Sequence, residues 1–191
     1  MRLIQYVTRN GERKVGLVSG SSSTLTEIKA FSSVREMALA ARRAGLGLAE
    51  LVRANSTTTD VDYNKIVGEG RLLPPLDHPE PSRCTLAITG LTHTGSAFSR
   101  DAMHTQHGAA PLTDTMKLFN MGLEGGKPKY GAVGVQSEWA YKGDGRWAVA
   151  PGGDIVSPSF ALDGGEEAEI AGLYVIGDQG EVLRVGFALA N

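Results

Sequence analysis

The first hydrophobic and polar positions of the chain predict a short β-hairpin. Residues Arg2 to Val7 and Lys14 to Val18 alternate in polarity or are β-branched, as strands of a half-buried sheet do. Between them stands Asn10-Gly11, a pair that tolerates positive φ and is typical of a tight hairpin turn. A third strand is expected at roughly Thr24 to Ile28.

The next segment has the spacing of a helix with a defined start. Ser33 stands three residues before Glu36, which is the spacing of a capping box. Gly45 is expected to end this helix, and a second, shorter helix is expected to begin near Leu48. Apolar residues recur behind the cap at helical spacing, at Val34, Met37, Ala38 and Ala41.

A proline-rich stretch marks the expected domain boundary. From Val67 to Arg83 the chain reads "VGEGRLLPPLDHPEPSR", whose four prolines and two glycines forbid a continuous helix and disfavour a central strand. The pattern therefore predicts an α+β fold with a small N-terminal α+β domain over residues 1–76. A second domain is expected over residues 77–191.

Short apolar segments separated by Gly, Pro and Asp predict that this second domain is rich in β-structure. These segments read "CTLAITGL", "AVGVQSEWAYK", "WAVAP", "DIVSPSFAL" and the closing stretch. A helix is expected between them, around Ser99 to His107.

Composition excludes several classes of function. The 19 Lys and Arg residues against 21 Asp and Glu give a net charge of −2, so no basic surface for nucleic acid is expected. No run of about 18 apolar residues occurs, so no membrane span is expected. The single cysteine, Cys84, excludes an intramolecular disulfide and fits a reducing compartment, so a cytoplasmic location is expected.

The most suggestive chemistry lies in a pair of acids near the end of the chain. Glu167 and Glu169 are two residues apart on a predicted strand, so both side chains leave the same face. The following residues, Ile170 to Ile176, are apolar on both faces, which predicts a strand inside a sheet sandwich or similar core. Two buried carboxylates need a cation between them, and an all-oxygen site favours Mg²⁺, Mn²⁺ or Ca²⁺ over zinc. The alternative, favoured by spacing alone, is that the start of the strand protrudes and both acids are solvated.

Hairpin geometry suggests where a third ligand belongs. If Asp178-Gln179 form a two-residue loop, each acid faces a residue near the end of the chain. The predicted neighbours are Glu169 with Ala188, and Glu167 with Ala190. The position after Asn191 then falls beside the acids, so the sequence is expected to be cut through a metal site. Such a domain is expected to bind metal weakly and to pair with another chain or to be frayed near Asn191.

The closing stretch resembles the fumarylacetoacetate hydrolase superfamily. Its members carry Glu-x-Glu followed, after a hairpin, by a segment like "GYTIAND"; Glu167-Ala168-Glu169 matches the first element and "GFALAN", Gly186 to Asn191, matches the second. The segments "LLPPLDHPEPSRCTLAITGLT", "WAYKGDG" and "PGGDIVSPSFAL" also resemble family segments. Within the superfamily, "GLTHTGSA", "YKGDG" and "LDGGEEAEIAGLYVIG" look most like the sugar-acid dehydratase branch.

The resemblance implies a β-rich catalytic domain, incomplete at its C-terminus, of a divalent-metal lyase. Its substrate would be a 2-keto-3-deoxy sugar acid such as 2-keto-3-deoxyarabonate, and its assembly a homodimer or higher homo-oligomer. Glu167 and Glu169 would hold Mg²⁺, Mn²⁺ or Ca²⁺. The substrate would be bound by Lys142, His93, Ser96 and Arg100.

Two alternatives remain open. Hydrolytic members of the superfamily read "GLNYxxHA", and a C–C hydrolase of acylpyruvate or fumarylacetoacetate type is the first alternative. Here Ser96 stands at the position of their histidine and His93 at that of their tyrosine, which weakens this reading. The second alternative is an inactive fragment or a non-catalytic module that keeps only an assembly surface.

Overall fold

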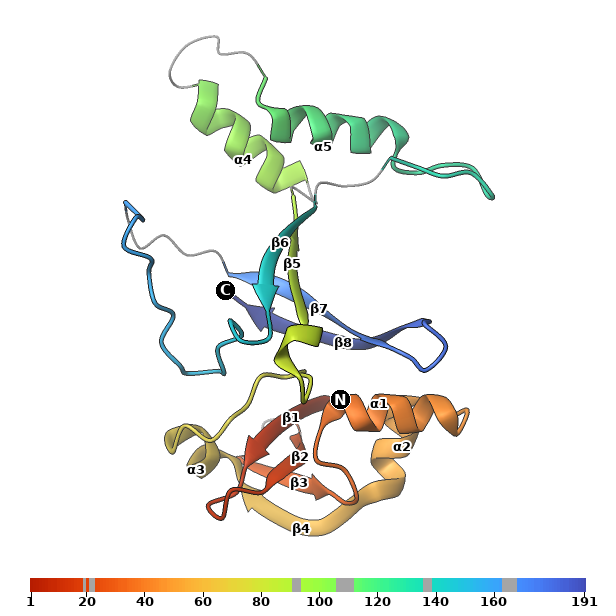
Figure 1. Ribbon diagram of the computed structural model, residues 1–191, viewed down its shortest axis with the longest axis vertical. Helices are drawn as coiled ribbons and strands as arrows, with labels where there is room; N and C mark the ends of the chain where they lie inside the picture. The colour runs from red at the N-terminus through yellow and green to blue at the C-terminus, as the bar shows by residue number, and fades with distance from the viewer. Residues whose placement is uncertain (19, 21–22, 91–93, 106–111, 136–138, 163–167) are drawn as a thin grey trace. The chain divides into compact units, whose positions relative to one another are not determined.

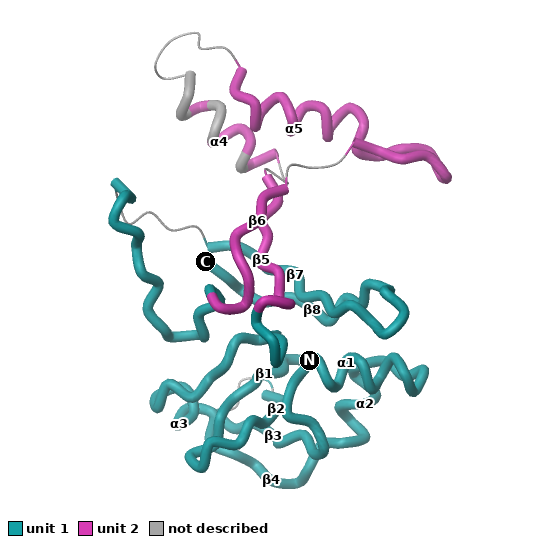
Figure 2. The backbone as a smooth tube through the Cα atoms, in the orientation of Figure 1, with its two compact units in different colours: residues 1–81, 147–191 teal, residues 82–146 magenta. Residues whose placement is uncertain are grey.

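The chain contains both helices and strands and divides into two compact units. The computed structural model describes residues 1–18, 20, 23–90, 94–105, 112–135, 139–162 and 168–191. The first unit joins Met1–Pro81 to Trp147–Asn191, and the second comprises Ser82–Arg146 (Figure 2). The chain is therefore of the α+β class, and each unit is described by itself below.

The first unit is built on a four-stranded antiparallel sheet (Figure 1). The predicted hairpin and third strand are confirmed, and Gly11 has the positive φ of 85° that its turn requires. The fourth strand was not expected, because its sequence, "STTTDVD", lacks alternating apolar residues. The strands, in their order across the sheet, are β1 (Arg2–Val7), β2 (Arg13–Val18), β3 (Thr24–Ile28) and β4 (Ser56–Asp62).

Three helices accompany this sheet: α1 (Val34–Arg43), α2 (Leu48–Asn55) and α3 (Tyr63–Gly68). As expected, the Ser33 hydroxyl caps α1 by accepting a hydrogen bond from the Glu36 backbone N–H at 3.1 Å. The Glu36 carboxylate accepts from the N–H and hydroxyl of Ser32 rather than from Ser33, so the box is shifted by one residue. The third helix was not expected, and its cap is the Asp62 carboxylate.

Apolar side chains on both faces of the sheet form the core. One face packs against α1 and α2, and its buried residues are Val15, Ile28, Val34, Met37, Ala41, Leu51 and Val52. The opposite face packs against α3 through Tyr6, Val18, Leu25 and Ile66. Because successive residues of a strand point to opposite faces, the strand apolar residues divide between these two clusters.

A buried glutamine joins three parts of the first unit. Gln5 has no exposed surface. Its Oε1 accepts from the Val34 N–H at 2.8 Å, and its Nε2 donates to the Pro74 carbonyl at 2.7 Å and to Asp77 Oδ1 at 3.1 Å. The Arg13 Nη2 donates to both oxygens of the same aspartate, at 2.9 and 2.7 Å. One side chain of β1 thus fixes both the start of α1 and the proline-rich segment that follows α3.

The closing hairpin, β7 (Glu169–Ile176) and β8 (Val182–Ala190), packs on α1 by its turn end. Val175 is buried against Ala38 and Leu39 of the helix. Two ion pairs flank this contact. The Arg43 Nε lies 2.6 Å from Asp178 Oδ2, and the Arg42 Nε lies 2.9 Å from Glu181 Oε1.

Two expectations about the hairpin are wrong. Its loop is not the two residues Asp178-Gln179: the Gly177 N–H bonds the Glu181 carbonyl, and Gly180 at φ 83° completes a three-residue loop. The longer loop and an extra residue in β8, Val185, together place Glu169 opposite Ala190 rather than Ala188, so the expected pairing of Ala190 with Glu167 is wrong as well. The strands pair as far as Ala190.

The expectation that β7 lies inside a sandwich is also wrong. Among its residues only Val175 is buried, and β7 pairs with β8 alone among the strands that the structure describes. Apolar composition on both faces of a strand does not guarantee burial, since burial depends on the elements available to cover each face.

The described part of the second unit contains an antiparallel pair, β5 (Thr85–Thr89) and β6 (Trp139–Asp144), and two α-helices. The helix expected near Ser99 to His107 is α4 (Thr94–Thr105), whereas α5 (Asp114–Gly125) was not expected. In the first unit, the described segments "WAVAP" and "DIVSPSFAL" form no strand, contrary to expectation. Their prolines and the Gly152-Gly153 pair interrupt any ladder. No described helix has the length and apolar character needed to cross a membrane.

Replacing Gln5 by alanine is expected to lower the free energy of unfolding by about 2 to 4 kcal/mol, because the Val34 N–H and the Pro74 carbonyl lose their buried partner. Urea denaturation followed by circular dichroism measures this change. The matched control is Gln179→Ala, which truncates an exposed glutamine in the hairpin loop and is expected to cost less than about 0.5 kcal/mol. Equal losses in the two variants would contradict the role of Gln5.

Acid is expected to release the hairpin turn from α1 before it disturbs the edge of the N-terminal sheet. Hydrogen bonding from Arg43 lowers the pKa of Asp178, and backbone amides, aided by Arg42, lower the pKa of Glu181. Each lowered pKa contributes stability above the ordinary carboxyl pKa of about 4, and this is lost as pH falls through the folded-state value.

An internal reference is Glu69, whose pKa hydrogen bonds from Arg9 and Arg71 lower to about 2. Amide NMR spectra recorded from pH 6 down to pH 2 should therefore show the signals of Gly177 and Gly180 changing before those of Glu69 and Arg71. Asp178→Asn should show part of the hairpin change already at neutral pH. Simultaneous change of both regions would argue against the ion pairs as the hairpin's anchor.

Candidate functional site

The expected metal site is represented in the described structure by Glu169. This residue is the first of β7, pairs with Ala190 and is exposed. Glu167, the other expected ligand, lies outside the described residues. Because the Glu169 carboxylate is solvated, the argument that buried acids demand a cation does not apply to it. The expectation of a metal at this position rests instead on the resemblance of Glu167-Ala168-Glu169 to the Glu-x-Glu element of the superfamily.

The described residues do not by themselves make up a metal centre. Within the described ranges, no group of three or more His, Cys, Asp or Glu side chains lies close enough together to hold an ion. The donor chemistry of Glu167 and Glu169 still suits a hard divalent cation, since carboxylate oxygens are the ligands that Mg²⁺ and Ca²⁺ prefer. The two glutamates therefore match such a cation in the type of ligand atom that they supply.

Lys142, an expected substrate-binding residue, occupies a β-bulge. Its neighbours Tyr141 and Gly143 pair with Ala87 and Leu86, which are consecutive on β5, so Lys142 is the extra residue of β6. The side chain is exposed, and Gly143 takes the φ of 126° that L side chains rarely adopt. Bulges redirect side chains out of the regular ladder and are common beside binding sites.

The acid of β6, Asp144, pairs with Arg146 and not with Lys142. Asp144, the only acid of this strand, is buried and accepts hydrogen bonds from the Arg146 N–H, Nε and Nη2, the last at 2.6 Å. These hydrogen bonds from Arg146 lower the pKa of Asp144. The carboxylate is thus neutralised by Arg146 rather than by Lys142, whose ammonium faces solvent and can meet an anion.

The remaining expected residues are only partly described. Ser96 and Arg100 belong to α4, but their side chains lie outside the described part of the structure, as does all of His93. Glu169 belongs to the first unit, and Lys142, Ser96 and Arg100 belong to the second (Figure 2). Each half of the expected site is accordingly a feature of its own unit.

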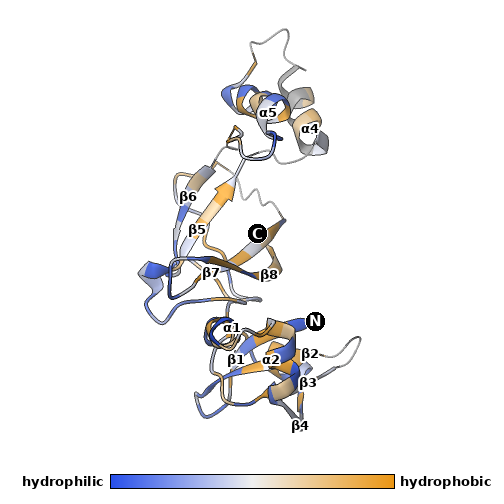
Figure 3. Cartoon of the chain, turned by 90° about the vertical axis from the view of Figure 1, so that its right-hand side faces the viewer, coloured by the Kyte–Doolittle hydropathy of each residue, from blue (hydrophilic) through white to orange (hydrophobic). Residues whose placement is uncertain are grey.

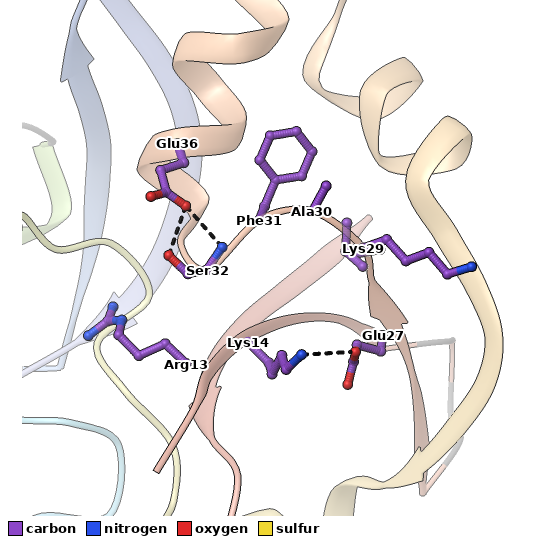
Figure 4. A pocket seen from close by; sticks show the side chains of 9 residues that line it. Arg13, Lys14, Glu27, Lys29, Ala30, Phe31, Ser32 and Glu36 are labelled. Atoms are coloured by element: carbon purple, nitrogen blue, oxygen red, sulfur yellow. Dashed lines mark hydrogen bonds and ion pairs between the residues drawn. The ribbon is translucent and has the colours of Figure 1, made fainter. Parts of the chain in front are cut away.

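A surface hollow of the first unit was not expected from the sequence (Figure 4). Its volume is about 450 Å³, and residues of β2, β3 and the start of α1 line it. Its charged groups are largely engaged: Lys14 lies 3.5 Å from Glu27, Arg13 binds Asp77, and Glu36 binds Ser32. Ala30 adopts a positive φ of 66° at its rim. These engaged charges favour a solvated depression over a reaction site.

Comparison of the chain with protein-family models, with curated proteins and with solved structures finds no match in any of the three. The resemblance stated from the sequence therefore remains an expectation. The proposed roles of the site residues rest on that resemblance and on the residues' own chemistry.

Proposed function

We propose that this chain belongs to a divalent-metal-dependent lyase that dehydrates a 2-keto-3-deoxy sugar acid, such as 2-keto-3-deoxyarabonate. The observation that carries the proposal is the Glu167-x-Glu169 motif directly before a hairpin whose return strand contains "GFALA". In the finer architecture we propose, residues 77–191 form part of a β-rich catalytic domain of the fumarylacetoacetate hydrolase type. The expected N-terminal domain, residues 1–76, precedes it.

The acid pair is proposed to hold Mg²⁺, Mn²⁺ or Ca²⁺. Two carboxylates two residues apart in the sequence supply the hard oxygen donors that these cations prefer. When bound, a divalent cation polarises the keto group of the substrate and makes the neighbouring C–H bond more acidic. The exposure of Glu169 leaves its carboxylate accessible to an ion from solvent.

Lys142 is proposed to bind the carboxylate of the sugar acid. An ammonium on a bulge, exposed and without a described ion pair, can pair with an anionic substrate without first breaking a contact within the protein. Arg100 is proposed as a second cation for the same anion. His93 and Ser96 are proposed to contact the substrate.

The reaction removes one molecule of water. A C–H bond next to the keto group and the neighbouring C–OH bond break, a carbon–carbon double bond forms, and the proton and hydroxide leave as water. A dehydratase is preferred to a C–C hydrolase because Ser96 and His93 occupy the positions of the histidine and tyrosine in hydrolytic members. The dehydratase needs no histidine to activate an attacking water.

The proposed location of the protein is the cytoplasm. With one cysteine and no disulfide possible within the chain, a reducing compartment suits it.

The alternative function is a non-catalytic assembly module. One observation favours it, namely the exposed apolar side chains of β7 and β8.

The substrate proposal predicts turnover of 2-keto-3-deoxyarabonate in excess Mg²⁺, followed by NMR of the dehydrated product. Glu169→Gln is expected to lower the rate by roughly 100-fold or more because it removes a charged ligand, and chelation with EDTA should abolish turnover. The matched control, Glu50→Gln, changes an exposed acid of α2 and should leave the rate unchanged. Turnover of acylpyruvates alone would favour the hydrolase, and turnover of neither class would favour the assembly module.

The role of Lys142 is tested by its replacement with methionine, which keeps length and removes charge. Loss of a charge-assisted contact to the substrate carboxylate should raise KM by about 10- to 100-fold with a smaller change in kcat. Lys129→Met, at an exposed residue of the same unit, is the control and should leave KM unchanged. An unchanged KM in Lys142→Met would remove this lysine from the binding site.

A further inference from the structure

The end of β6 and the turn after it place one acid between two cations. The sequence there is Lys142-Gly143-Asp144-Gly145-Arg146, so a lysine and an arginine each stand two residues from the aspartate. All five residues belong to the second unit. Spacing alone does not decide which cation the carboxylate binds, because both side chains are long and flexible enough to reach an acid two residues away.

In the structure the carboxylate binds Arg146. The chain turns directly after β6, and the Arg146 N–H donates to Asp144 Oδ1 at 3.0 Å. In the side chain, Nε donates to Oδ1 at 2.9 Å and Nη2 donates to Oδ2 at 2.6 Å. A planar guanidinium matches the two oxygens of a carboxylate as a fork, which an ammonium cannot do. Arg146 therefore binds the acid through its backbone and its side chain together.

On the other side of the acid, the bulge separates Lys142 from it. Gly143 stands between the two residues with a φ of 126°, and Lys142 makes no ion pair within the described part of the chain. The opposite strand, β5, reads "TLAIT" and has no charged residue. Figure 3 shows hydrophobic colouring over much of β5, whereas β6 includes hydrophilic positions. Asp144 is the acid nearest to Lys142 along the sequence.

We infer that Arg146 is a positioning residue for Lys142: by binding Asp144, it keeps this carboxylate from pairing with the Lys142 ammonium. Asp144 is only 6% exposed, and a buried carboxylate that loses its cation is strongly destabilised until it finds another. Without Arg146, the acid would therefore recruit the lysine. With Arg146 in place, the lysine charge stays available for an anionic ligand.

The inference rests on the proposed function in one respect, which is that the ligand of Lys142 is the carboxylate of a sugar acid. The competition between the two cations for Asp144 does not depend on any substrate. Hydrogen bonding to Asp144 raises the pKa of Arg146, and hydrogen bonding from Arg146 lowers the pKa of Asp144. Both groups are thus charged at neutral pH, and Arg146 holds the acid under the conditions in which a substrate carboxylate is ionised.

The first test follows the ammonium protons of Lys142 by ¹⁵N NMR, because these protons exchange with water quickly when solvated and slowly when a carboxylate holds them. In the unmodified chain they should exchange as fast as those of Lys129, an exposed lysine of the same unit. Arg146→Met should slow the exchange at Lys142 several-fold, because Asp144 then binds the ammonium. The double variant Asp144→Asn/Arg146→Met should restore fast exchange, and Lys129 should be the same in every chain.

The second test measures turnover of 2-keto-3-deoxyarabonate by the same chains. Arg146→Met should raise KM about 5-fold with a smaller change in kcat, since an intramolecular ion pair then competes with the substrate. The double variant should return KM to within about 2-fold of the original value. Asp144→Asn alone should not raise KM, because it leaves both cations free. The matched control, Arg53→Met, removes an exposed arginine of α2 and should change neither KM nor the exchange at Lys142.

The two tests separate this inference from the proposed function. Slow exchange at Lys142 in the unmodified chain, or unchanged exchange in Arg146→Met, would overturn the role of Arg146. A KM raised by Arg146→Met and not restored in the double variant would overturn it as well, since Arg146 would then act other than through Asp144. Absence of turnover in every chain would contradict the proposed function alone, and the exchange rates would still decide whether Arg146 keeps the acid from Lys142.

Discussion

The buried amide of Gln5 is the interaction on which the first unit depends. An amide side chain has donors and an acceptor, and here both kinds are used between segments that are distant in sequence: the acceptor holds the first N–H of α1, and the donors hold the Pro74 carbonyl and Asp77. The sheet, the helix and the proline-rich segment are therefore positioned by one residue. Since α1 in turn carries the turn end of the β7–β8 hairpin, the position of that hairpin also traces back to β1.

Features determined by neighbouring residues could be predicted from the sequence. The hairpin at Asn10-Gly11 and the cap at Ser33 depend on local backbone conformation and on side chains three residues away, and both occur as expected. The strand β4 and the helix α3 depend instead on pairing with β3 and on packing against the opposite face of the sheet. Their own residues carry no clear alternation, so local patterns could not identify them.

The candidate site shows the same division. That Glu169 lies on a strand and that a hairpin follows could be read from the sequence. The partner of Glu169 in β8 could not be predicted from the sequence. Gly180, with its positive φ, lengthens the loop by one residue, and the bulge shifts the register by one more. Burial of β7 was also misjudged, since an apolar strand needs a partner surface that its own residues do not specify.

The bulge at Val185 sets the sidedness of the whole return strand. In an uninterrupted ladder, Phe187 and Leu189 would share the side of Leu183, and the small residues Ala188 and Ala190 would share the side of Val182. The extra residue thus places Phe187 and Leu189, instead of two alanines, on the side of Val182. The turn and its ion pairs lie before the bulge and are unaffected. Deleting one residue at the bulge would therefore move every side chain between it and Ala190 to the opposite side of the hairpin.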